Sequence, residues 1–95
     1  MPNNAERDCE AEVRSWGFRH VFTWTDGPNA YYRPHTHAGL TTHLIVRGQL
    51  TIAYPADDPA RTKTTHGVGD RLDVAAGRSH EVWVGPEGCT YVIGE

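Results

Sequence analysis

The chain changes its hydrophobic period once, after the first seventeen residues. Between residues 4 and 16 the apolar side chains recur at i, i+4 and i+7: Cys9, Val13 and Trp16. Such spacing places them in one narrow stripe on a helix. Asn3 or Asn4 can cap this helix at its start, and Gly17 can end it. The pattern therefore predicts a short N-terminal helix over residues 4–16.

From residue 18 onward the pattern follows a period of two and favours β-branched and aromatic residues, which is typical of strands. The predicted strands cover residues 18–25, 30–33, 41–47, 49–54, 71–74, 81–84 and 90–93. Short strands separated by Gly and Pro turns predict an all-β barrel or sandwich. Residues 55–65 are polar and Pro-rich, so we expect an exposed hairpin loop there.

Length and charge narrow the choice of function. The 95 residues suit one domain, 1–95, with the helix at 4–16 and the β-body at 18–95. The net charge of −3, with Lys and Arg scattered singly, argues against nucleic acid and anionic membranes as partners. Binding of a small molecule is the better expectation.

No run approaches the ~20 apolar residues of a membrane span, and the first residues lack the pattern of a signal peptide. We therefore expect a cytoplasmic protein. Cys9 and Cys89 lie near opposite ends of the chain and form no C-x-x-C pattern. In a reducing compartment two such thiols are more often packed side chains than a disulfide.

Four of the six histidines fall in two short segments of the chain: His35, His37 and His43 in the first, His80 in the second. On a strand, His35 and His37 share one face about 7 Å apart, from which two imidazoles can converge on one ion. The alternative is a pair of solvated surface histidines, which an H-x-H sequence alone does not exclude. His20 and His66 have no partner at ligand spacing, so we do not assign them to a site.

The two histidine segments resemble the two sequence motifs of the cupin superfamily. The first motif, H-x-H-x3-E-x6-G, matches His35, His37 and Gly48, with Thr41 at the glutamate position. The second motif, G-x5-P-x-G-x2-H-x3-N, matches at these residues: Gly69, Gly77 and His80. Ala75 replaces its proline and Val84 its asparagine. The motifs occur in order and cover about half the chain, like those of a small single-domain, RmlC-like cupin.

This resemblance implies a cupin-type jelly-roll β-barrel that binds one divalent metal inside one end. Carried over by position, His35, His37 and His80 are the implied metal ligands. Thr41 is a neutral hydroxyl and cannot replace the family's carboxylate. By strand alternation His43 faces the same way as Thr41, about 7 Å farther along. His43 is therefore the candidate for a fourth metal ligand or a catalytic base, and the alternative is a hydrogen-bonded histidine one layer below the site.

An imidazole-rich site suits several metals, so Fe, Zn, Ni and Mn all stay open. The first functional hypothesis is a metalloenzyme with dioxygenase-like or Lewis-acid chemistry on a small molecule. Three-histidine sites are similar to those of the thiol and diketone dioxygenases of this superfamily. The second hypothesis is a non-catalytic module that binds or senses a small molecule. The third is a structural role for the histidines in an interaction or storage domain.

Aromatic residues along the strands are candidates for the mouth of a pocket, although such residues more often belong to a core or an interface. They are Trp24, Tyr31, Tyr32, Trp83 and Tyr91. If His80 points inward, Glu81 and Trp83 point outward. An outward Trp predicts burial against the helix or a second subunit, so we expect a homodimer.

Overall fold

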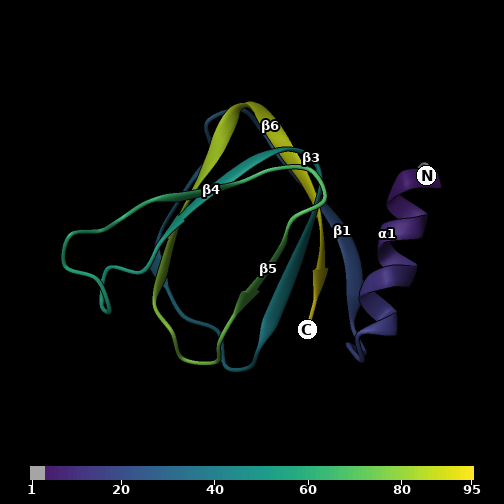
Figure 1. The fold of residues 1–95 in the computed structure, drawn as a ribbon, viewed down its shortest axis with the longest axis horizontal. Helices are drawn as coiled ribbons and strands as arrows, with labels where there is room; N and C mark the ends of the chain where they lie inside the picture. The colour runs from purple at the N-terminus through teal and green to yellow at the C-terminus, as the bar shows by residue number, and fades with distance from the viewer. Residues whose placement is uncertain (1–3) are drawn as a thin grey trace.

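The computed structural model describes residues 4–95 and contains one helix and six strands (Figure 1). The elements are α1 (Asn4–Ser15), β1 (Val21–Asp26), β2 (Tyr31–His35), β3 (Thr41–Ala53), β4 (Thr64–His66), β5 (Arg71–Val74) and β6 (His80–Gly94). The predicted helix and all-β body are confirmed. Of the two predicted capping residues, Asn3 lies outside the described residues and Asn4 is the first residue of α1.

The strands form two antiparallel half sheets because β3 and β6 are each long enough to run through both. In the first half sheet, β1 pairs with the end of β6, which pairs with the start of β3, which pairs with β5. In the second, β2 pairs with the start of β6, which pairs with the end of β3, which pairs with β4. This arrangement is consistent with a jelly roll. Within residues 4–95 the hydrogen-bonded path stops at the outer strands, so the sheet stays open.

The central pair of strands changes register where the half sheets meet. The pairing of β3 with β6 shifts between Ile45 and Arg47 and again between Gly48 and Leu50. Gly48 has a φ of 78°, and a Cβ added there would lie 2.1 Å from the carbonyl oxygen of Gly88. Only glycine can take both this backbone conformation and this close approach without strain.

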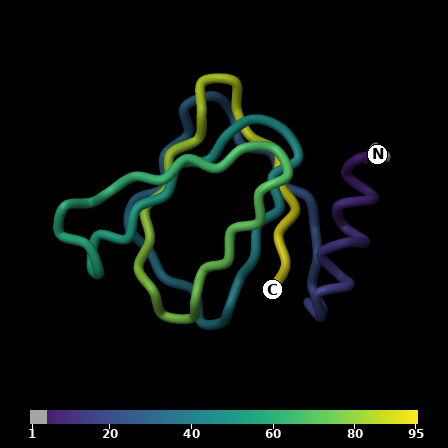
Figure 2. Tube along the Cα trace, in the orientation of Figure 1, coloured from purple at the N-terminus to yellow at the C-terminus, as the bar shows by residue number. Residues whose placement is uncertain are grey.

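These irregularities explain where the predicted strand boundaries are wrong. Residues 41–47 and 49–54 are one strand, and residues 81–84 and 90–93 are also one strand, because bulges absorb the glycines without ending the pairing. The predicted loop at 55–65 is shorter, since Thr64 and Thr65 pair with β3. The remaining loop extends away from the body on the side opposite to α1 (Figure 2).

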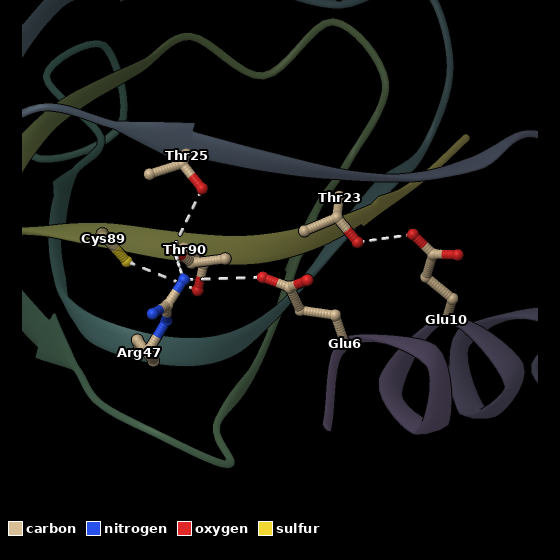
Figure 3. Close-up of polar contacts among 7 residues, drawn as sticks. All are labelled: Glu6, Glu10, Thr23, Thr25, Arg47, Cys89 and Thr90. Carbon is tan, nitrogen blue, oxygen red and sulfur yellow. Dashed lines mark hydrogen bonds and ion pairs between the residues drawn. The ribbon is translucent and has the colours of Figure 1, made fainter. Parts of the chain in front are cut away.

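Helix α1 covers the outer face of the first half sheet. Its Val13 is fully buried and packs with Leu44, Val46 and Val92. Polar contacts border this apolar patch (Figure 3): the Thr23 hydroxyl donates to Glu10 at 2.5 Å, and the Arg47 guanidinium lies 3.5 Å from Glu6. Among the described residues no helix is long and apolar enough to cross a membrane.

The inner faces of the half sheets bury a second group of apolar residues. Ile45, Leu50, Val84, Cys89 and Tyr91 form one cluster, which joins both half sheets. Both cysteines are free, as predicted: Cys89 is in this cluster, whereas Cys9 lies on α1 and packs against the apolar cluster between the helix and the sheet. Burial raises the pKa of the Cys89 thiol to about 11.

Candidate metal centre and pocket

Three of the four predicted ligands come together at one edge of the second half sheet. His35 ends β2 and His80 begins β6, and the two are direct partners in the sheet register. His37 follows two residues after His35, in the turn that leads to β3. The ring centroids are 4.2 Å apart for His35 and His80, 5.2 Å for His35 and His37, and 5.1 Å for His37 and His80.

This group, which we call the histidine triad, has the donor set and spacing of a metal site. One ligand nitrogen from each residue lies within 4.8 Å of the other two. Among the described residues the triad is the group of His, Cys, Asp and Glu that meets this distance. Imidazole nitrogens suit Zn, Fe, Ni and Cu. The three histidines of the triad could therefore hold the divalent metal that the sequence resemblance implied.

Hydrogen bonds to the backbone fix the tautomer of two triad members. His35 Nδ1 lies 2.7 Å from the carbonyl oxygen of Arg33, and His80 Nδ1 lies 3.1 Å from that of Arg78. A carbonyl can only accept, so in each ring Nδ1 carries the proton and donates it. The lone pair is then on Nε2, the nitrogen available to a metal. Such a bond also holds the ring in position, as is usual for ligating histidines.

Burial favours the neutral form of His80. Its side chain is 2% exposed, and desolvation lowers its pKa below the usual value, with a further lowering from the neighbouring His35 and His37. Only the neutral imidazole has a lone pair for a metal. His80 is therefore ready to bind a metal at neutral pH without first losing a proton.

His43 lies outside the triad, on the first half sheet. Its Nδ1 donates to the carbonyl oxygen of Leu72 at 3.3 Å, and its ring lies 5.6 Å from that of Tyr91. Burial lowers its pKa to about 4. His43 lines the same cavity as the triad, and its Nε2 has the free lone pair. His43 is thus a neutral base that lines the same cavity, and it does not belong to the group of three histidines that could hold a metal.

Thr41, at the position of the family's glutamate, and Glu81, the acidic residue next to His80, both lie outside the triad. Thr41 is buried, and its hydroxyl oxygen is without a hydrogen-bond partner among the described residues. Glu81 is buried on the outer face, where the Tyr31 hydroxyl donates to its Oε2 at 2.5 Å. Neither residue lines the cavity. The site therefore contains no carboxylate from the family's glutamate position or from Glu81.

A cavity of about 260 Å³ lies beside the triad, between the two half sheets. Six of its thirteen lining residues are aliphatic: Leu50, Ile52, Leu72, Val74, Val82 and Ile93. Trp24, Tyr32 and Tyr91 also line it, so three of the five predicted aromatic residues belong to the pocket. Trp83 does not. It packs outside against Tyr31, at 5.7 Å between ring centroids, and beneath the Lys63 ammonium, at 4.2 Å.

Asp26 is the polar residue of this region that the sequence did not reveal. It is 6% exposed and accepts hydrogen bonds from Trp24 Nε1 at 3.0 Å, from the Tyr91 hydroxyl at 2.7 Å and from the Tyr32 hydroxyl. Burial, followed by these bonds, raises the pKa values of Tyr32 and Tyr91. In the sequence Asp26 precedes Gly27 and Pro28, which is the usual pattern of a turn. No sequence signal marked it as buried.

Comparison with known proteins gives similarity at the level of structure. No protein-family model matches the sequence, and no curated protein sequence matches it. A cupin-2 domain protein from Shewanella frigidimarina is 20% identical with a TM-score of 0.64, over 79% of this chain and 67% of that chain. An RmlC-like cupin from the same organism is 15% identical with a TM-score of 0.62, over 77% and 60% respectively.

The polyketide cyclase RemF from Streptomyces resistomycificus is also similar. It is 19% identical with a TM-score of 0.65, over 77% of this chain and 50% of that chain. The chain thus spans between half and two thirds of the length of these three proteins. Identities this low establish the architecture and leave substrate and reaction open. On the evidence of the half sheets, the histidine triad and these neighbours, the chain has the fold of the cupin superfamily.

Proposed function

We propose that this protein binds one divalent transition metal through the histidine triad and acts on a small molecule in the adjoining cavity. The observation that carries the proposal is the convergence of three imidazoles beside an apolar cavity. A bound metal would supply Lewis acidity or, in the case of iron, a site for dioxygen chemistry. Fe, Zn, Ni and Mn are the candidates.

The chain's own residues have distinct roles in this proposal. His35, His37 and His80 hold the metal, and the carbonyl groups of Arg33 and Arg78 orient two of the rings. The aliphatic part of the wall lowers the polarity around the reacting groups. His43 lines the cavity with its Nδ1 proton donated to Leu72, and its unprotonated Nε2 serves as a base toward the small molecule or as a fourth ligand.

The main alternative is a non-catalytic module that binds or senses a small molecule. The composition of the cavity wall favours it: among the described lining residues none is an Asp or Glu, the commonest acid or base besides histidine. The two candidates differ in turnover. Metal-dependent consumption of dioxygen or of a small-molecule substrate supports the enzyme, whereas saturable binding without consumption supports the module.

The first experiment is elemental mass spectrometry of tag-free protein, as purified and after reconstitution with each of the four metals. We expect close to one equivalent of metal in the wild type and loss of that metal in the His35→Ala/His37→Ala variant. The matched control is His20→Ala/His66→Ala, which removes two histidines outside the triad. The proposal fails if the wild type takes up none of the metals, or if both double variants retain them equally.

A third variant tests whether His43 is a metal ligand or a base. If His43 is a ligand, His43→Gln weakens metal binding by about 10-fold or more in a chelator competition. If it is a base, the metal affinity stays within about twofold and only turnover falls. Unchanged affinity together with unchanged turnover would leave His43 without a role in this site.

A further inference from the structure

The charges around the cavity beside the triad bear on which ligands the cavity can hold. Among its described lining residues there is no Lys, Arg, Asp or Glu. A ligand in this cavity therefore finds no cationic side chain in the wall. With three neutral imidazoles as ligands, a bound metal would be the positive centre available to an anionic group.

A negative charge lies behind the aromatic part of the wall. The carboxylate of Asp26 accepts bonds from Trp24, Tyr32 and Tyr91, all of which line the cavity. Three donors to one carboxyl group match its ionised form, which only accepts. Tyr32 links the two regions, because its hydroxyl donates to Asp26 while its ring lies 6.2 Å from the ring of His35.

The size of the cavity limits the ligand. An apolar cavity of about 150 Å³ is large enough for benzene. A cavity of about 260 Å³ then accommodates a compound of roughly ten to twelve non-hydrogen atoms. Its aliphatic wall favours an apolar or aromatic body over a sugar or a nucleotide, whose many polar groups would lose their hydrogen bonds to water.

We propose that Asp26 is a specificity-determining residue: the pocket takes small apolar or aromatic monoanions and rejects dianions of the same shape. The inference rests on the proposed function, because the metal holds the single anionic group. A second anionic group in the cavity would be desolvated without a cation to pair with and would be repelled by Asp26. Trp24, Tyr32 and Tyr91 hold the Asp26 carboxylate in place and screen it from direct contact with the ligand.

The test uses the full chain loaded with zinc and two probes of nearly identical shape, 4-nitrobenzoate and terephthalate. They differ by one negative charge, because a nitro group replaces one carboxylate. Isothermal titration calorimetry should give an affinity for 4-nitrobenzoate at least about 30-fold higher than for terephthalate, since the second carboxylate would lose its hydration without gaining a cationic partner. The His35→Ala/His37→Ala variant should bind neither probe.

Substitutions of Asp26 and Trp24 then test the cause of the selectivity. Asp26→Asn removes the charge at nearly constant size, and it should reduce the preference for 4-nitrobenzoate at least about fivefold. Trp24→Lys is a second route if Asp26→Asn does not fold, because Trp24 lines the cavity and is 49% exposed. It places a cation at the pocket and should favour terephthalate. Its matched control is Thr25→Lys, which adds the same charge at the next position, where the side chain bonds Thr90 on the outer face.

The outcomes separate this inference from the proposed function. Stoichiometric zinc together with equal binding of the two probes, or with binding of neither, overturns the inference and leaves the metal site standing. Selectivity that is unchanged in both Asp26→Asn and Trp24→Lys, or altered equally by Thr25→Lys, shows that Asp26 is not its source. Failure of the wild type to bind zinc overturns the proposed function and the inference together.

Discussion

The stability of the folded protein should depend on pH in part through a single residue, His43. Its pKa in the folded chain is about 4, below the 6.5 of a solvated imidazole, because the side chain is desolvated. As the pH falls, the unfolded chain therefore takes up this proton first. The stability contributed by neutral His43 is complete above about pH 6.5 and is lost as the pH falls toward 4.

We expect metal-free wild type to lose about 2 kcal/mol more stability between pH 7.5 and 4.5 than the His43→Phe variant, which has no titrating group at this position. Urea unfolding at the two pH values measures the difference. His80 has a shift of the same sign and is present in both proteins, so its effect cancels. Parallel losses in the two proteins would show that His43 is not buried in its neutral form.

Thr41 leads to a second prediction at this scale. Its hydroxyl is buried without a partner among the described residues, and burying an unsatisfied polar group costs free energy. Thr41→Val keeps the shape and removes the hydroxyl, so it should raise the free energy of unfolding by about 1 kcal/mol. Metal content should not change, because the hydroxyl is not a proposed ligand. A loss of metal in this variant would place Thr41 in the site after all.

At the level of elements, Gly48 controls the junction between the half sheets. Its positive φ and the 2.1 Å approach of the Gly88 carbonyl oxygen to an added Cβ leave no room for a side chain. Gly48→Ala should therefore destabilise the protein by more than about 2 kcal/mol in urea unfolding. Gly67→Ala is the matched control, because a Cβ there meets nothing within 4 Å and φ is not positive. Equal effects of the two substitutions would contradict the observed bulge.

The strands also show how far local pattern predicts an element. The alternation of apolar and polar residues located β5 with its observed ends and found most of β3 and β6. It divided β3 at Gly48 and β6 near Gly85 because a glycine in a strand has the same local signal whether it ends the strand or forms a bulge. The difference depends on whether a neighbouring strand continues the ladder, and that is a contact between residues distant in sequence.

At the level of the whole molecule, both half sheets contribute histidines to the wall of one cavity. His35 and His80 belong to the second half sheet, whereas His43 belongs to the first. Any change in the angle between the half sheets would alter the separation of His43 from the triad. The junction at Gly48 thus contributes to the geometry of the proposed site as well as to stability.

A homodimer stays a prediction. Several large apolar side chains are exposed on the single chain: Trp24, Tyr31, Tyr32, Leu40 and Val68. Light scattering after size-exclusion chromatography should give twice the 10.6 kDa mass of one chain. A mass of 10.6 kDa that does not depend on concentration would show a monomer, and these side chains would then be open to solvent or to ligand.

The sequence by itself determined the helix, the all-β body and the three residues of the triad. The helix and strands could be predicted because the hydrophobic period is a local property of the sequence. The triad could be predicted because the motif spacing places His35, His37 and His80 at the ligand positions that the cupin resemblance implies. Only the tertiary structure decided that His43 lines the same cavity as the triad from the other half sheet, and that Asp26 is buried behind three aromatic donors. Both depend on strand register and on bulges, which bring together residues that local sequence does not relate.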